Sequence, residues 1–221
     1  MWKNYLAIMY RNMLLQKLNT LINILGLVAG ISAASLIFLY VHTELKFDES
    51  WDNADELYRV NETFEYFRKE STPYALTSHV LGKRMRSEFP DMQVCRLETG
   101  DYGNNIFVDD KWLNPGRIKH ADDNFFKLFT YPQTAFTRRT DTLPRAWIAK
   151  KKYEKYFEPY NTRTFRYGEK WYELAGTFNK SGYQSHLDID LIVPYDSLIL
   201  NDYKHTWDWT RLNTLTYVRA D

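Results

Sequence analysis

The chain has 221 residues, a net charge of +1 and 17% aromatic residues. The aromatic content argues against intrinsic disorder, since disordered segments contain few aromatic residues. All charges in residues 1–43 are positive, at Lys3, Arg11 and Lys17, so residues 44–221 carry a net charge of −2. This larger part has no basic excess and is not expected to bind nucleic acid.

Residues 1–17 are predicted to form an amphipathic helix. Its apolar residues recur at helical spacing, at Trp2, Leu6, Met9 and Met13. A basic helix with an apolar stripe and a tryptophan suits the headgroup layer of a membrane. Two interpretations stay open: the helix contacts a cytoplasmic partner, or it only anchors the segment that follows.

Residues 18–41 contain no charged residue and predict a transmembrane helix, with the whole span assigned to 18–43. As a helix, 18–41 would extend about 36 Å, against about 30 Å for the core of a bilayer. A signal peptide is the alternative, but its apolar run usually covers only about 7–15 residues. A retained membrane helix is therefore favoured.

The charges around this span predict its orientation. Lys3, Arg11 and Lys17 precede it, and no acidic residue occurs before Glu44. Because basic residues stay on the cytoplasmic side, the N-terminus is expected inside and residues 44–221 outside. In a bacterium, the outer compartment is the periplasm.

Gly26, Gly30 and Ala34 recur at every fourth position within the span. Such small residues lie on one face of a helix and allow a second helix to approach closely. We interpret them as a helix-packing face, although glycine is also common in membrane spans for other reasons.

After the span, residues 43–55 are interpreted as a helical stalk. Its acidic residues Asp48, Glu49, Asp52 and Asp55 lack the EF-hand pattern, so a solvated face is favoured over a cation site. Residues 58–66 alternate in polarity and predict a strand. Residues 73–89 predict a helix, with Pro73 at its first position and Pro90 after its end.

The remaining residues predict an α+β domain in which strands alternate with a few helices. Short strands and turns are expected in 93–112, and a helix in 150–157. The pattern further predicts a strand at 146–148, a hairpin of 164–167 with 170–178, and final strands at 187–193 and 215–219.

No catalytic, cofactor or metal motif stands out. The sequence lacks a G-x-x-x-x-G-K-[ST] phosphate loop, and its five histidines show no metal-ligand spacing. Ser185 and His186 are adjacent, but neighbouring residues of a strand point to opposite faces, which is poor geometry for a nucleophile and its base. Cys95 is the only cysteine and is interpreted as a small buried hydrophobic residue.

An ordered set of motifs resembles the MacB/FtsX-like ABC transporter permeases, in the version found in Bacteroidetes. The motifs are Trp2-Lys3-Asn4-Tyr5-Leu6, Leu21-Ile22-Asn23-Ile24-Leu25-Gly26-Leu27, Asn53-Ala54-Asp55-Glu56-Leu57-Tyr58-Arg59-Val60, Phe125-Phe126-Lys127-Leu128-Phe129, Ala175-Gly176-Thr177-Phe178 and Ser185-His186-Leu187-Asp188-Ile189-Asp190. Each motif alone is weak, but together they cover nearly the whole chain in the order of the family.

The resemblance implies one transmembrane helix followed by a mixed α/β periplasmic core domain, residues 44–221. This domain would have a porter-like lobe with a strand-rich lobe inserted at about 91–130. The resemblance also implies a non-enzymatic permease that forms a homo- or heterodimer and pairs with a cytoplasmic ABC ATPase. Lys3, Arg11 and Lys17 would be the residues near that ATPase, and the outer domain would meet a substrate or a periplasmic partner.

Family members continue into three more membrane helices, so a chain that stops at Asp221 is expected to be the N-terminal part of a permease. Two alternatives stay open. One is a membrane-anchored sensor or adaptor that binds a ligand outside the cytoplasm. The other is a membrane-anchored periplasmic enzyme, which the lack of a catalytic motif disfavours.

Overall fold

The computed structural model describes residues 2–45, 48, 51–52, 54–63, 73–99, 103–183, 185–196, 209 and 212–219. These residues belong to two compact units, Met1–Phe47 and Asp48–Asp221. We call them the helical unit and the sheet domain, and each is described by itself.

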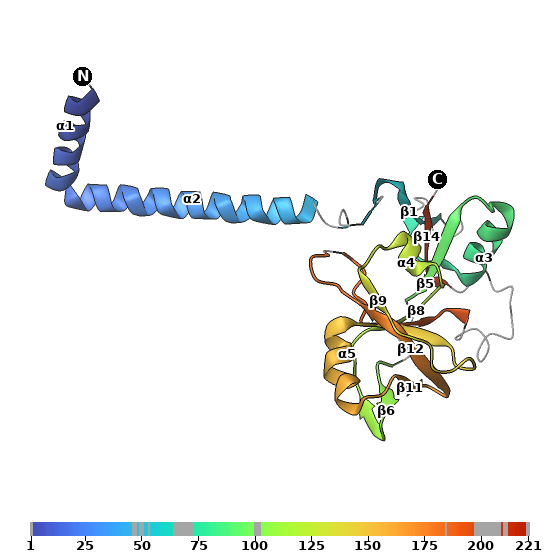
Figure 1. The fold of residues 1–221 in the computed structure, drawn as a ribbon. Helices are drawn as coiled ribbons and strands as arrows, with labels where there is room; N and C mark the ends of the chain where they lie inside the picture. The colour runs from blue at the N-terminus through green and yellow to red at the C-terminus, as the bar shows by residue number, and fades with distance from the viewer. Residues whose placement is uncertain are drawn as a thin grey trace. The chain divides into compact units, whose positions relative to one another are not determined.

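The helical unit contains α1 (Trp2–Leu15) and α2 (Lys17–Leu45), with a sharp turn of the chain between them (Figure 1). The hydroxyl of Thr20 in α2 donates to the carbonyl of Met13 in α1 across this turn, at 3.2 Å. With 29 residues, α2 extends about 44 Å, and none of its residues is buried by the protein. A helix that is apolar all round needs an apolar surrounding, which for an exposed helix is a membrane. The predicted membrane helix is thus present, as the one candidate span among the described residues.

The predicted helical stalk over 43–55 is wrong. α2 ends at Leu45, and Asp48 has a positive φ of 64°, a conformation that does not continue a right-handed helix. Trp51 is only 4% exposed, and its ring lies 4.5 Å from that of Tyr131 between ring centroids. Burial of this large side chain in the sheet domain outweighs helix propensity and directs the chain into the core.

The sheet domain is built on a twelve-stranded sheet. Its main path runs β1 (Leu57–Val60), β14 (Leu212–Arg219), β5 (Gln93–Glu98), β8 (Ile118–Ala121), β13 (Leu191–Pro194), β10 (Arg145–Ala149), β12 (Lys170–Phe178), β11 (Thr164–Tyr167), β6 (Ile106–Val108) and β7 (Lys111–Leu113). Beside this path, β4 (Thr77–Ser78) pairs with β14, and β9 (Gln133–Ala135) pairs with β12. A separate small sheet joins β2 (Glu62–Thr63) and β3 (Pro73–Tyr74).

Three α-helices accompany the sheet: α3 (His79–Glu88), α4 (Phe125–Leu128) and α5 (Lys150–Tyr156). Short 3₁₀ turns form at Ala54–Glu56 and Glu158–Tyr160. α3 packs on β5 and β14, whereas α5 packs on β10 and β12 at the other end of the domain (Figure 1). The sheet is mixed, since β10 and β12 are parallel, as are β8 and β13, and the other pairs are antiparallel. The parallel pair β10 and β12 needs a crossover connection, which α5 and β11 provide.

Two buried clusters form the core. One gathers aromatic residues around Trp51, Phe125 and Phe129, and the other lies around Ile148, Phe165 and Leu174. Residues 91–130 contribute to both clusters and place β5 and β8 inside the main sheet, with β6 and β7 at its end. These contacts do not separate residues 91–130 from the rest of the domain, so the inserted lobe stays a prediction.

The helix predicted from Pro73 begins later, at His79. Ser78 caps α3 by accepting a hydrogen bond from the backbone N–H of Val80 at 3.3 Å. The hydroxyl of Thr77 lies 3.0 Å from the carbonyl of Thr214, so the preceding residues pair with β14 instead of joining the helix. Residues 187–190, predicted as part of a strand, precede β13, which begins at Leu191. The strand predicted over 58–66 is observed as two strands, β1 and β2, which belong to different sheets, and residues 64–66 lie outside the described residues. The other predicted elements lie within a few residues of the observed ones.

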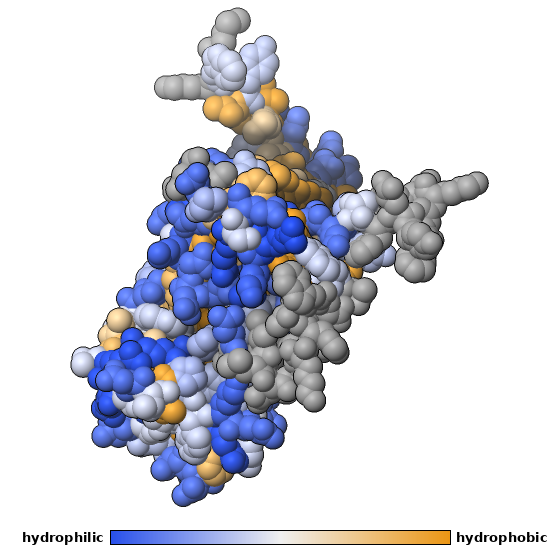
Figure 2. Space-filling model, turned by 90° about the vertical axis from the view of Figure 1, so that its right-hand side faces the viewer, coloured by the Kyte–Doolittle hydropathy of each residue, from blue (hydrophilic) through white to orange (hydrophobic). Residues whose placement is uncertain are grey.

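One face of the sheet domain is largely polar. On the face shown in Figure 2, hydrophilic residues predominate and hydrophobic ones are scattered among them. This face contrasts with the apolar side chains exposed along α2.

Candidate functional site

The predicted helix-packing face is open. A Cβ atom added at Gly26 or Gly30 would meet no atom within 4 Å. Ala34 lies two helical turns beyond Gly26 on the same face of α2. The structure therefore leaves room for a second helix here, and the packing of such a helix stays a prediction.

The basic residues assigned to an ATPase contact lie in the helical unit. Lys3 and Arg11 belong to α1, and Lys17 is the first residue of α2. The side chains of Arg11 and Lys17 are exposed to solvent. Their accessibility is compatible with a contact to a partner, and that contact stays a prediction.

The chain enters the sheet domain through a hydrogen-bonded group that we call the entry clasp: Asp48, His186 and Tyr217. The Asp48 carboxylate lies 2.7 Å from Nδ1 of His186 and 3.2 Å from its backbone nitrogen. Nε2 of His186 lies 2.5 Å from the hydroxyl of Tyr217 in β14. Burial raises the pKa of Tyr217, so its phenol stays protonated within the clasp.

Trp51 provides a second attachment close to the clasp. Its indole contacts the rings of Phe129 and Tyr183 as well as Tyr131, with centroid distances of 5.3 and 5.1 Å to the first two. The backbone N–H of Asp52 donates to the hydroxyl of Thr130 at 3.0 Å. Asp48, Trp51 and Asp52 are therefore fixed in the sheet domain by buried aromatic contacts and by the clasp.

The segment 185–190 connects the clasp to the rest of the domain. Leu187 and Ile189 are buried in the core, whereas Asp188 and Asp190 form ion pairs. Asp190 lies 2.8 Å from Nζ of Lys180 and accepts from the backbone N–H of Arg117 at 3.1 Å. Of the four residues 187–190, only Asp188 is exposed, and the segment is not a strand.

The clasp does not form a hydrolase site with the neighbouring serine. The hydroxyl of Ser185 accepts from the backbone N–H of Leu187, and both ring nitrogens of His186 are engaged elsewhere. This arrangement agrees with the poor geometry predicted from the sequence. Asp48 joins the clasp instead of a solvated acidic face, and Glu49 lies outside the described residues. In the described part of the chain, no cluster of three or more His, Cys, Asp or Glu could hold a metal ion.

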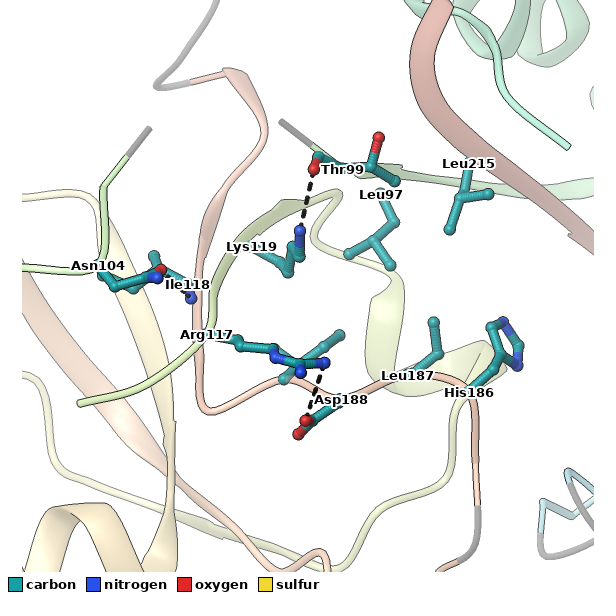
Figure 3. Close-up of a pocket in the computed structure, with 11 residues that line it drawn as sticks. Leu97, Thr99, Asn104, Arg117, Ile118, Lys119, His186, Leu187, Asp188 and Leu215 are labelled. Atoms are coloured by element: carbon teal, nitrogen blue, oxygen red, sulfur yellow. Dashed lines mark hydrogen bonds and ion pairs between the residues drawn. The ribbon is translucent and has the colours of Figure 1, made fainter. Parts of the chain in front are cut away.

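A pocket of about 380 Å³ lies beside this segment (Figure 3). Leu97, Ile118 and Leu187 contribute apolar surface, and Arg117 and Lys119 contribute charge. Both cations have partners within the chain: Arg117 pairs with Asp188 at 3.0 Å, and Lys119 donates to the carbonyl of Thr99 at 3.1 Å (Figure 3). The charges of both cations are therefore engaged within the chain.

Cys95 is buried with 0% exposure, and burial raises the pKa of its thiol. The prediction of a small buried hydrophobic residue is confirmed.

Sequence reasoning missed the partnership of Asp48 with His186, because the two residues are separated by 138 positions and neither belongs to a motif for such a contact. It also missed the buried ion pair of Arg96 and Asp122, whose Nη2 and Oδ1 atoms lie 2.7 Å apart.

Comparison with known proteins places this architecture in a family. Residues 20–221 match the profile of the MacB-like periplasmic core domain. A permease domain from Porphyromonas gingivalis, described as putative, is similar in structure, with a TM-score of 0.60, 16% identity, and coverage of 78% of this chain and 76% of that one. No curated protein sequence matches the chain.

Two further solved structures are similar over a comparable length. The periplasmic region of MacB from Actinobacillus actinomycetemcomitans has a TM-score of 0.47 and 12% identity, covering 75% of this chain and 74% of that one. The extracellular domain of the noncanonic ABC-type transporter YknZ from Gram-positive bacteria has a TM-score of 0.44 and 12% identity, covering 75% and 82%. Because the family profile spans most of the sequence, the chain belongs to the MacB-like periplasmic core domain family of ABC transporter permeases.

Proposed function

We propose that this chain acts in a permease that works with a cytoplasmic ABC ATPase. The observation that carries the proposal is the family match over residues 20–221, together with the apolar helix α2 that precedes the sheet domain. In this function the ATPase supplies the energy, and the permease transmits motion to the periplasmic domain for export. The permease itself performs no chemical reaction.

The short connection from α2 into the sheet domain supports the transmission of motion from the helix to the domain. The clasp residue Asp48 and the buried Trp51 follow within six residues of Leu45, the last residue of α2, and both are held in the sheet domain. A movement of the helix along its axis would therefore act on His186 and Tyr217 instead of being absorbed by a long linker.

We further propose that α1 lies on the cytoplasmic surface of the inner membrane and that the sheet domain lies in the periplasm. The basic residues before α2 support this orientation. Replacement of Lys3, Arg11 and Lys17 by glutamine should produce a mixed topology, measured with a reporter fused after Asp221. A reporter that stays fully periplasmic would contradict the assigned role of these charges.

The central experiment is co-purification of the protein with a candidate ABC ATPase of the same organism. We expect ATPase activity in lipid nanodiscs to depend on the permease. The double variant Arg11→Gln/Lys17→Gln should weaken this dependence in protein whose reporter fusion still shows a fully periplasmic sheet domain. Lys150→Gln/Lys151→Gln removes the same charge from exposed positions of α5 and serves as the control. No association with the ATPase would contradict the proposal and favour a sensor or adaptor.

A further inference from the structure

Four side chains form one row across four neighbouring strands at the end of the sheet. Trp112 of β7 lies opposite Phe107 of β6, Phe107 lies opposite Arg166 of β11, and Arg166 lies opposite Trp171 of β12. Directly opposed residues in antiparallel strands point to the same face of a sheet. We call these four residues the aromatic row.

The aromatic row faces away from the core. Its neighbours along β11, Phe165 and Tyr167, are buried in the core cluster on the other face. Trp112 is 58% exposed and Trp171 is 46% exposed. The row is open on the Trp112 side, because β7 is the last strand of the main path of the sheet. Two large aromatic side chains therefore lie on this surface without a packing role in the core.

Arg166 gives the row its charge. Its guanidinium carbon lies 5.0 Å from the ring centre of Phe107 and 5.5 Å from that of Trp112. Within the described residues, Arg166 forms no ion pair, and its Nε atom is buried without a hydrogen-bond acceptor. A guanidinium that is held on aromatic rings and has no ion pair is suited to a carboxylate that approaches from its exposed side.

These properties favour a protein as the ligand. Tryptophan and arginine are enriched among the residues that dominate protein interfaces. The guanidinium of Arg166 lies over Phe107 and Trp112, which places a positive charge in the middle of the row and reduces the aromatic surface on which a sugar could stack. We propose that the aromatic row binds an extended segment of a different protein, with an Asp or Glu side chain on Arg166 and apolar side chains on Trp112 and Trp171. The proposal depends only on this surface and not on coupling to an ATPase.

The test uses a photo-reactive phenylalanine analogue at position 112 of the full-length protein in its native membrane. Position 111 is the matched control, since it neighbours Trp112 on β7 and its side chain points to the other face. We expect a cross-linked adduct with one protein from position 112 and none from position 111. Peptide mapping of the adduct should identify a segment with an acidic residue.

The role of Arg166 is tested in the same assay. We expect Arg166→Gln to reduce the adduct about tenfold or more, because a residue central to an interface carries much of its affinity. Changing the mapped acidic residue of the partner to its amide should cause a similar loss, and the two losses should not add. Trp171→Ala leaves the charge of Arg166 in place and should also reduce the adduct. The thermal unfolding of each variant is measured to exclude misfolding.

Several outcomes would overturn the proposal. These are no adduct at position 112, an equal adduct at position 111, or an adduct that folded Arg166→Gln leaves unchanged. An adduct with a second copy of this chain would assign the row to self-association, and an adduct with a glycan would assign it to saccharide binding. Either result would replace the proposed partner.

Discussion

At the level of single residues, the buried pair of Arg96 and Asp122 connects α3 to the sheet. The Asp122 carboxylate accepts from Nε of Arg96 at 3.0 Å and from its backbone N–H at 2.7 Å, and it also binds Arg86 of α3. Burial alone would lower the pKa of Arg96, but Asp122 raises it overall, so the guanidinium stays charged. A buried ion pair is stable only when its geometry and hydrogen bonds are complete, as they are here.

Gly82 is required by this pair. A Cβ atom at position 82 would lie 2.5 Å from Cγ and 2.8 Å from Cδ of Arg96, whose end is held by Asp122. Gly82→Ala should therefore lower the free energy of unfolding by about 1–2 kcal/mol, because overpacking outweighs the better helix propensity of alanine. Urea denaturation measures the change. Lys83→Ala, on the exposed side of α3, is the control, and equal stability of the two variants would contradict the prediction.

The burial of His120 predicts that the free energy of unfolding of the sheet domain depends on pH. Burial, followed by the charges of Lys119 and Lys170, lowers its pKa from 6.5 to about 4. Between these two values the unfolded chain binds a proton that the native chain does not bind, so stability falls as the pH decreases from about 6.5 to about 4. The total loss from this residue is at most about 3 kcal/mol.

The variant His120→Gln isolates this contribution. It should be less stable than the parent at pH 7.5, and the difference should shrink as the pH approaches 4, because only the parent carries the penalty for charging the imidazole. Urea denaturation at several pH values measures both chains. Two parallel stability curves would contradict the assignment.

At the level of elements, the ends of helices are decided by what the next residues bury. α2 continues past the predicted span to Leu45, then ends because Trp51 joins the core. α3 loses its predicted first turn because Thr77 and Ser78 pair with β14. In both cases local sequence is compatible with helix, and a contact distant in the sequence determines the outcome.

The membrane helix predicts a packing contact that depends on small residues. Gly30→Ile should weaken self-association of α2 by about 1 kcal/mol, or about fivefold, in a membrane reporter assay, because the branched side chain keeps a second helix at a distance. Val28→Leu, on another face of α2, should leave the signal unchanged. If Gly30→Ile also leaves the signal unchanged, α2 does not self-associate through this face.

At the level of the whole molecule, the chain divides into an apolar helical unit and a domain with its own core. The sheet domain buries two clusters of apolar and aromatic residues and presents one largely polar face (Figure 2). Its only cysteine is buried, so no disulfide contributes to its stability. The domain should therefore fold without the membrane helix and without an oxidant.

This expectation is tested on residues 44–221 expressed alone. The fragment should be soluble, and its midpoint of thermal unfolding should be the same with and without a reductant, because Cys95 is inaccessible to both. Circular dichroism and gel filtration measure the two properties. A fragment that folds only under oxidising conditions would contradict the burial of Cys95.

The sequence by itself determined the membrane helix, the mixed domain of helices and strands, and the hairpin across Gly168. Each of these depends on composition or periodicity within a short window, where neighbouring residues carry the signal. The ordered motifs also identified the family, which the profile match confirms. The basic and small residues of the helical unit were named from the sequence too, and their roles stay predictions.

Only the tertiary structure decided which distant residues meet. The entry clasp joins Asp48 to His186 and Tyr217, the buried ion pair joins Arg96 to Asp122, and the aromatic row assembles side chains from four strands. Strand order and register set these contacts, and neither is encoded in the periodicity of any single segment. The physical reason is that periodicity reports which side of an element is buried, whereas a site depends on which elements become neighbours.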